Sequence, residues 1–290
     1  MSIELGIILA FAAMLCWGFG DFLIQKSTRK FGDWETLFII TIFGSIVLFP
    51  FVYKEIPSIF SFHNSKFLLL ITASVILLFA ALFEFESLKK GKISVVEPIW
   101  SMEIPASALL AFLIIKENVS LTQIILIVAL IFGLILVSLR SYHLSKHIWL
   151  EKAAFLALAS ALMMGAANFF VGWGSRETGA FATKWFVDTF IALVSFIYIF
   201  STKRIHRMEL DISKNKKLLG SMCVLDNAAW VAFGFSMVLA PISIAVAISE
   251  SYIIICVLLG MFVAKEKLRI HQKIGLILAI IAAISLAVMI

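Results

Sequence analysis

The chain has 290 residues, of which 62% are hydrophobic and only 14% are charged, and its mean hydropathy is +1.07. This composition lies outside the range of water-soluble domains and predicts an integral membrane protein. It excludes an enzyme with a water-facing catalytic lobe, because the apolar segments use nearly the whole chain. The net charge of +6 does not predict nucleic-acid binding, since the basic residues concentrate between the apolar segments and at their ends.

A helix that crosses the hydrocarbon core needs about 20 mainly apolar residues. The sequence contains ten such segments and therefore predicts an all-α integral membrane fold. In chain order they cover 3–24, 35–53, 66–87, 93–115, 120–138, 150–173, 180–200, 218–239, 242–264 and 270–290.

The chain repeats itself, which predicts two domains, 1–145 and 146–290, with five helices each. An Ile-Ser pair followed by a Lys-Glu pair occurs in both halves at an offset of 149 residues, as Ile93-Ser94 with Lys116-Glu117 and as Ile242-Ser243 with Lys265-Glu266. Because each half has an odd number of spans, the second half must enter the membrane upside down. We therefore predict ten transmembrane helices arranged as two inverted five-helix repeats.

Basic residues predict the orientation of the chain. The connections after spans 1, 3, 5, 7 and 9 carry 19 of the 24 lysines and arginines, counting each with its nearest connection. The positive-inside rule then places both termini outside the cell membrane.

Spans 1 and 8 pair a tryptophan with a carboxylate. Trp17 and Asp21 lie one helical turn apart in the first span, and Asp226 and Trp230 do so in the eighth. An aromatic face beside a carboxylate suits an organic cation or a zwitterionic amine. A tryptophan that only anchors or packs its helix is the alternative. At the position equivalent to Asp21, the second half carries Asn168.

The fourth span combines acids with prolines. Pro98 and Pro105 remove two backbone donors, so that the carbonyls one turn before them lose their usual partners. Loosened backbone beside Glu97, Ser101 and Glu103 can coordinate a substrate or act as a hinge. Kinks that serve only helix packing are the alternative.

Carboxylates lie deep within several spans. Glu103, Asp188, Asp226 and Glu250 fall near the middle of their spans, whereas Asp21 lies nearer to one end. An ionised carboxylate there costs at least about 2.5 kcal/mol, so such groups usually face a water-filled path, a proton relay or a cationic ligand. Deep bases are absent from the spans, although Lys184, near the start of span 7, has the spacing to pair with Asp188.

No cofactor or metal is expected. The three cysteines form no CxxC pair, and the five histidines fall between spans or at span ends. The sequence also lacks a phosphate-binding glycine loop and a nucleophile elbow.

These residues carry a resemblance to a known family. The sequence resembles the drug/metabolite transporter superfamily, specifically proteins with two EamA-type domains. The features that carry the resemblance are the two five-span halves, Trp17-Gly18 late in the first span, the acids and prolines of the fourth, and the glutamates after spans 4 and 9 (Glu117 and Glu266). The resemblance implies a secondary carrier that works by alternating access, often as an exporter. It also implies that spans 1–4 and 6–9 surround a central cavity and that spans 5 and 10 are peripheral.

The prediction is thus a proton-coupled transporter, not an enzyme, that exports an amino acid, amine or drug-like compound as a monomer or homodimer. Its partners would be a small-molecule substrate, protons and the lipid bilayer. Glu103, Glu250, Asp226 and Trp230 would lie in the cavity, with Asp21 and Trp17 at one mouth. The alternatives are a lipid-carrier flippase, for which the basic run 203–217 is the candidate site, an uptake permease, and a non-transporting scaffold.

Overall fold

The computed structural model describes residues 2–60, 65–90, 99–138, 152–205, 214–255, 258 and 268–289, and these residues form helices and short connections without a strand. Within these described ranges, eight helices are long and apolar enough to span a membrane. They are α1 (Ile3–Phe31), α2 (Asp33–Val52), α4 (Ser65–Lys90), α7 (Leu121–Ser138), α8 (Lys152–Thr178), α9 (Ala180–Ser201), α11 (Lys216–Leu239) and α14 (Ile270–Val288). The remaining elements are shorter: α3 (Ile56–Ile59), α6 (Glu103–Ile114), α12 (Ile242–Ser249) and the 3-10 helix η2 (Glu250–Tyr252).

Two helices extend well beyond their predicted spans. α1 continues seven residues past 24 and α8 five residues past 173, because polar residues near the membrane surface can continue a helix as well as apolar ones. Each then ends at a single glycine that turns the chain directly into the next helix. Gly32 has φ +109° and Gly179 has φ +92°, a region that side chains disfavour.

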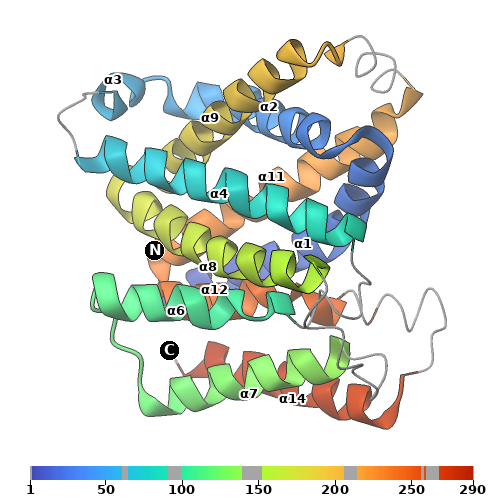
Figure 1. Ribbon diagram of the computed structural model, residues 1–290. Coiled ribbons are helices and arrows are strands. Elements are labelled where there is room, and N and C mark those ends of the chain that lie inside the picture. The colour runs from blue at the N-terminus through green and yellow to red at the C-terminus, as the bar shows by residue number, and fades with distance from the viewer. Residues whose placement is uncertain are drawn as a thin grey trace.

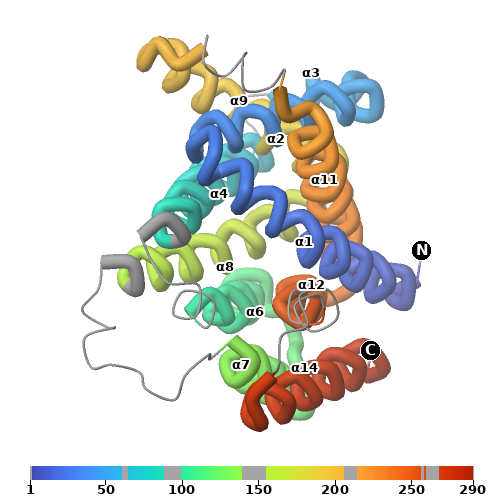
Figure 2. The backbone as a smooth tube through the Cα atoms, turned by 90° about the vertical axis from the view of Figure 1, so that its right-hand side faces the viewer, coloured from blue at the N-terminus to red at the C-terminus, as the bar shows by residue number. Residues whose placement is uncertain are grey.

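Helices from the two halves of the chain pack against each other. α1 packs against α11, α4 against α8, α2 against α9 and α7 against α14. α7 and α14 lie together at one end of the bundle and α2 and α9 at the other (Figures 1 and 2). The fifth and last predicted spans are therefore peripheral, as the resemblance implied.

Contacts at the helix ends define two faces. Both termini lie on one of them, at the left of Figure 1, which we call the terminal face. There Lys66, at the start of α4, donates to the backbone carbonyl of Glu177, at the end of α8, over 2.6 Å. On the opposite face Lys30, at the end of α1, donates to Asn215, before α11, over 2.7 Å. α1 and α8 thus run in opposite directions.

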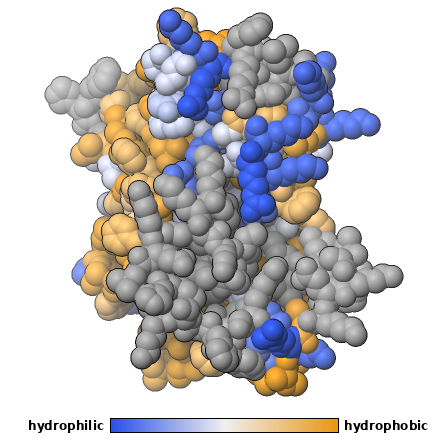
Figure 3. All heavy atoms as spheres, turned by 45° about the vertical axis from the view of Figure 1, so that its right-hand side comes forward, coloured by the Kyte–Doolittle hydropathy of each residue, from blue (hydrophilic) through white to orange (hydrophobic). Residues whose placement is uncertain are grey.

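The opposite face is basic. Figure 3 brings it forward and shows hydrophilic side chains gathered in its upper part. The ends of α1, α9 and α11 carry exposed basic residues there: Lys26, Arg29, Lys30, Lys203, Arg204, Lys214, Lys216 and Lys217.

The sides of the bundle are apolar. Large hydrophobic side chains such as Ile8 (62% exposed), Leu68 (68%) and Ile277 (59%) point outward from helices whose inner faces are also apolar. A surface of this kind is stable against lipid chains rather than water, which fits the membrane-spanning length of the helices.

Candidate functional site

Two helices are interrupted near the middle of the bundle. α6 begins only at Glu103, after a turn at Ser101 and Met102, and α12 ends at Ser249, where the chain tightens into η2. Pro105 lies in the first turn of α6, where its missing N–H leaves no hydrogen bond unmade. The two breaks lie 149 residues apart, so they occupy equivalent positions in the two halves. Broken helices deep in a membrane protein expose backbone groups that bind ligands.

Four carboxyls meet at these breaks. Glu103 interacts electrostatically with Glu250 of η2, Glu84 of α4 and Asp21 of α1. Glu250 in turn interacts with Asp21, and Glu84 with Glu250. Glu103 is buried and the other three are half-buried. We call these four residues the carboxyl cluster.

Two uncharged polar side chains complete the cluster. Asn168 of α8, only 1% exposed, donates from Nδ2 to Glu250 Oε1 over 2.9 Å. Its amide oxygen has no partner among the described residues. The half-buried phenol of Tyr252 interacts electrostatically with all four carboxyls. Both can donate to a carboxylate, and the Asn168 oxygen is available to a ligand.

The chemistry of the cluster favours protons or an organic cation. Among the described residues, the charged groups that act on Glu84, Glu103 and Glu250 are all acidic. Four like charges inside the bundle, one buried and three half-buried, repel one another, so the cluster must take up protons or a cationic group to be stable. Among the described residues, no three acids, histidines or cysteines lie close enough to hold a metal ion.

An aromatic group lies beside the cluster. The rings of Trp17 and Trp230 meet edge to face with centroids 5.3 Å apart, and Phe233 packs on Trp17 at 5.1 Å. The Trp230 side chain also hydrogen-bonds to Asp226 one turn earlier on α11. The two tryptophans predicted to flank a ligand therefore form one group, although they come from different halves of the chain.

Lys184 departs from the expectation that deep bases are absent. Its side chain is only 8% exposed, and its Nζ lies 2.6 Å from Asp188 Oδ1, which confirms the predicted pair. The same Nζ lies 5.6 Å from the centre of the Trp230 ring and acts on Asp226. The position near the start of α9 misled the prediction, because the long side chain reaches one turn deeper into the bundle.

Glu117 joins several elements on the terminal face. Its carboxylate accepts from the backbone nitrogens of Ile242 (2.8 Å) and Ser243 (2.9 Å) at the start of α12, and from the Ser243 hydroxyl (2.9 Å). Arg176, at the end of α8, donates to Glu117 Oε1 over 3.0 Å and to the carbonyls of Met237 and Ala240. We call Glu117, Arg176 and the first turn of α12 the latch.

The structure brings most of the predicted site residues together. Glu103, Glu250, Asp21 and Asn168 belong to one cluster, and Asp21 lies with the deep acids rather than at a mouth, because α1 continues well past it. Ser101 is buried beside the break, with an unpaired hydroxyl among the described residues. Asp226 interacts with Glu84 but is held by Trp230 and Lys184. Glu97 and Pro98 lie outside the described residues.

Two residues of this site, Glu84 and Tyr252, are absent from the predicted set. Glu84 falls near the end of the predicted span 66–87, but α4 continues to Lys90 and leaves Glu84 within the helix. Tyr252 lies 149 residues after Glu103, at the equivalent position of the second half. That correspondence was the available signal, since equivalent positions of two repeats face the same central space.

Comparisons with known proteins agree with this architecture. Residues 4–139 and 151–288 each match the EamA-like transporter family. Comparison with curated protein sequences finds no match. One solved structure, titled only "Crystal structure of protein", is 12% identical, with a TM-score of 0.76 over 98% of this chain and 96% of that chain, a likeness that shows the fold alone. The two family matches cover nearly all of the sequence, and the chain is therefore a multi-pass membrane protein that belongs to the EamA-like transporter family.

Proposed function

We propose that the chain exports a small polar metabolite that carries a cationic group, in exchange for protons. The observation that carries this proposal is the set of four carboxyls that act on one another around two broken helices, where the described charged groups that act on Glu84, Glu103 and Glu250 are all acidic. A desolvated carboxyl favours its protonated form, and a cationic ligand favours the ionised form. Protons and substrate would therefore compete for the same oxygens, and competition of this kind makes an antiporter.

Each group in the site has a role in the proposal. Glu103 and Glu250 exchange a proton for the cationic end of the substrate, and Asp21 and Glu84 share the remaining charge. Asn168 orients Glu250 through its 2.9 Å hydrogen bond and offers its amide oxygen to a donor on the substrate. Trp17 contributes an aromatic wall that suits the apolar part of an amine.

Alternating access would follow from two inverted repeats of five helices each, 1–145 and 146–290. The helix pairing supports this proposal, because exchanging the two halves converts the α1–α11 contact into α8–α4 and leaves α2–α9 and α7–α14 unchanged. The turn after α1 supports it as well. Arg29 and Gly32 recur as Arg176 and Gly179, both 147 residues later, and both glycines have positive φ. The antiparallel course of α1 and α8 supports the inversion that such repeats require.

The latch gives the proposed cycle a direction. If the basic opposite face lies in the cytoplasm of the cell membrane, as the positive-inside rule indicates, the latch and both termini lie outside. In this arrangement the contacts of the latch close the bundle on its outer side. Opening the latch would release substrate outward and admit protons.

Binding tests the proposal before any transport is measured. Purified protein would be screened for thermal stabilisation by pooled amines, amino acids, sugars and nucleosides. We expect stabilisation by a compound with an ammonium group, and its loss in Glu103→Gln and Glu250→Gln but not in Glu177→Gln, an exposed acid on the terminal face (45% side-chain exposure). Selective stabilisation by an isoprenoid phosphate, equal in the wild type and in both cluster variants, would instead support a flippase.

A further inference from the structure

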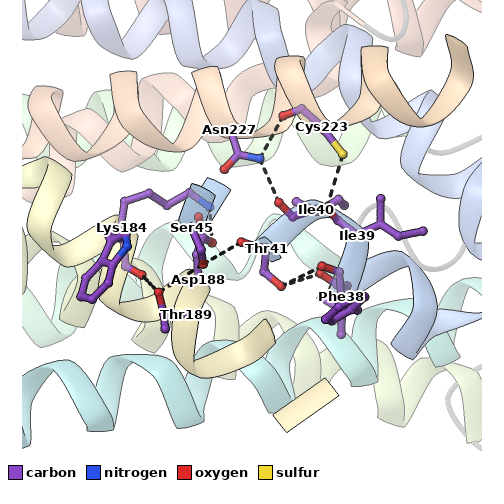
Figure 4. Close-up of polar contacts among 12 residues, drawn as sticks. Phe38, Ile39, Ile40, Thr41, Ser45, Lys184, Asp188, Thr189, Cys223 and Asn227 are labelled. Carbon is purple, nitrogen blue, oxygen red and sulfur yellow. Dashed lines mark hydrogen bonds and ion pairs between the residues drawn. The ribbon is translucent and has the colours of Figure 1, made fainter. Parts of the chain in front are cut away.

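A second polar group lies between α2, α9 and α11 (Figure 4) and shares no residue with the carboxyl cluster. Asp188 of α9 is 1% exposed and Asn227 of α11 is 7% exposed. Asp188 Oδ1 accepts from Lys184, but Oδ2 has no partner among the described residues, and neither does the amide oxygen of Asn227. Two buried oxygens without donors call for an explanation.

The hydrogen bonds of Asn227 fix the direction of its amide. Nδ2 donates to the carbonyl of Ile40 over 3.2 Å and to the carbonyl of Cys223 over 2.9 Å. Rotating the amide by half a turn would set its oxygen against both carbonyls, which is unfavourable. Oδ1 must therefore point away from them.

The space in front of Gly44 shows where both oxygens point. A Cβ atom built on Gly44 of α2 would collide with Asp188 Oδ2 and with Asn227 Oδ1 at once. The two oxygens therefore face the same point from different helices. Both accept hydrogen bonds, and an ionised Asp188 would leave them repelling each other in a buried site.

The neighbouring hydroxyls do not supply the missing donor. Ser45 donates to the carbonyl of Thr41 over 2.9 Å, and Thr189 donates to the carbonyl of Trp185 over 2.7 Å. Within the part of the chain that the structure describes, the charged groups that act on Asp188 are Lys184 of its own helix and Asp226 of α11. The thiol of Cys223, also on α11, points to the carbonyl of Ile39. α2 faces this site with Gly44 and hydroxyl groups.

We propose that Asp188 Oδ2 and Asn227 Oδ1 share a bound proton, which makes this group a proton-binding site distinct from the carboxyl cluster. The Asp188 O–H bond donates to the Asn227 oxygen, while Lys184 remains on the other carboxyl oxygen. When the proton leaves to water, the carboxylate repels Asn227 and loosens α9 from α11. Because Lys184 also acts on Asp226, which is bonded to Trp230, the proton changes the charge balance next to the proposed substrate wall.

Infrared difference spectroscopy on lipid-reconstituted protein tests this site without any transported substrate. We expect a protonated-carboxyl C=O band, sensitive to H/D exchange, that is present in the wild type at neutral pH and lost in Asp188→Asn. Asparagine at 188 can donate to Asn227 and accept from Lys184, so this variant should fold. If the spectrum of Asp188→Asn still contains every protonated-carboxyl band of the wild type, the proposal is overturned.

A second variant keeps the test decisive if Asp188→Asn does not fold. Asn227→Leu removes the acceptor, and the same band should shift to higher frequency because its hydrogen bond is lost. An unshifted band overturns the proposal. Stabilisation of the wild type by Na⁺ that disappears in Asn227→Leu would also overturn it, since the two oxygens would then bind a metal cation instead of a proton.

Discussion

The latch yields a prediction whose size follows from its hydrogen bonds. Glu117→Gln keeps the shape of the side chain but removes its charge. The native carboxylate accepts two backbone N–H groups, a hydroxyl and Arg176. The amide oxygen of glutamine can keep two of these four bonds, and the Ser243 hydroxyl can turn to accept from the NH₂ group, so that one or two bonds are lost.

Bonds to a charged group contribute about 1.5–3 kcal/mol each, and the Glu117 side chain is 8% exposed, so solvent compensates little. With about 2 kcal/mol taken for each bond, losing one or two of them weakens the closed state by about 2–4 kcal/mol. At about 1.4 kcal/mol per factor of ten, the equilibrium between closed and open forms shifts roughly 30-fold to nearly a thousandfold toward open.

Cysteine labelling measures this shift. In a background without the native cysteines, Ser101→Cys places a single thiol beside the break between α6 and its preceding turn. A membrane-impermeant maleimide added from the terminal face should label this thiol at least about 30-fold faster when Glu117 is glutamine. The matched control is Glu177→Gln on the same face, whose pair with Lys66 is exposed and contributes about 0–1 kcal/mol.

The labelling rate separates a gate from a structural contact. If Glu117→Gln lowers the melting temperature but leaves the labelling rate at the wild-type value, the latch only stabilises the fold. The reasoning that makes it a gate would then be wrong.

Three further predictions concern the cluster and the fold. Glu103→Gln and Glu250→Gln should each reduce proton-coupled flux at least about tenfold at unchanged expression, because each removes a proton-binding oxygen from the cluster. A flux equal to that of Glu177→Gln would contradict the role of these carboxyls in proton binding. Gly133→Val should lower stability by about 1–3 kcal/mol in thermal unfolding, since a Cβ there would lie 2.8 Å from the Gly275 carbonyl and the Ala279 nitrogen across the α7–α14 contact. Gly32→Ala should cost about 1–3 kcal/mol in thermal unfolding through its positive φ. The reference is Gly220→Ala inside α11, where a Cβ meets open space and alanine should raise stability by about 0.5–1 kcal/mol. Equal melting temperatures for the two variants would show that the turn tolerates a side chain.

The sequence predicted most of the fold because membrane helices must satisfy their own backbone. Hydrophobic length alone located eight helices to within a few residues at most ends, and the repeat offset related the halves. The errors lie where polar residues continue a helix. α1 and α8 extend past the predicted spans, so Asp21 was placed too near an end. α4 likewise continues to Lys90, three residues past the predicted span, and Glu84 was not among the predicted deep acids.

The candidate site was predicted less completely, since spacing along one helix says nothing about which helices meet. Trp17 and Trp230 were each recognised beside an acid, but their mutual contact depends on α1 packing against α11. Asn227 was not noticed at all, because its importance arises from an amide direction set by Ile40 on another helix. Lys184 was read as a residue near the membrane surface because sequence position does not show where a long side chain ends.

Proton movement in liposomes tests the central claim most directly. Purified protein with a pH dye trapped inside the vesicles would receive the compound found in the binding screen, with Glu103→Gln as the matched variant. The account predicts that the compound drives proton movement in the direction opposite to its own, and that the variant abolishes it. Transport of the compound without any proton movement would contradict the claim that the carboxyl cluster exchanges protons for substrate.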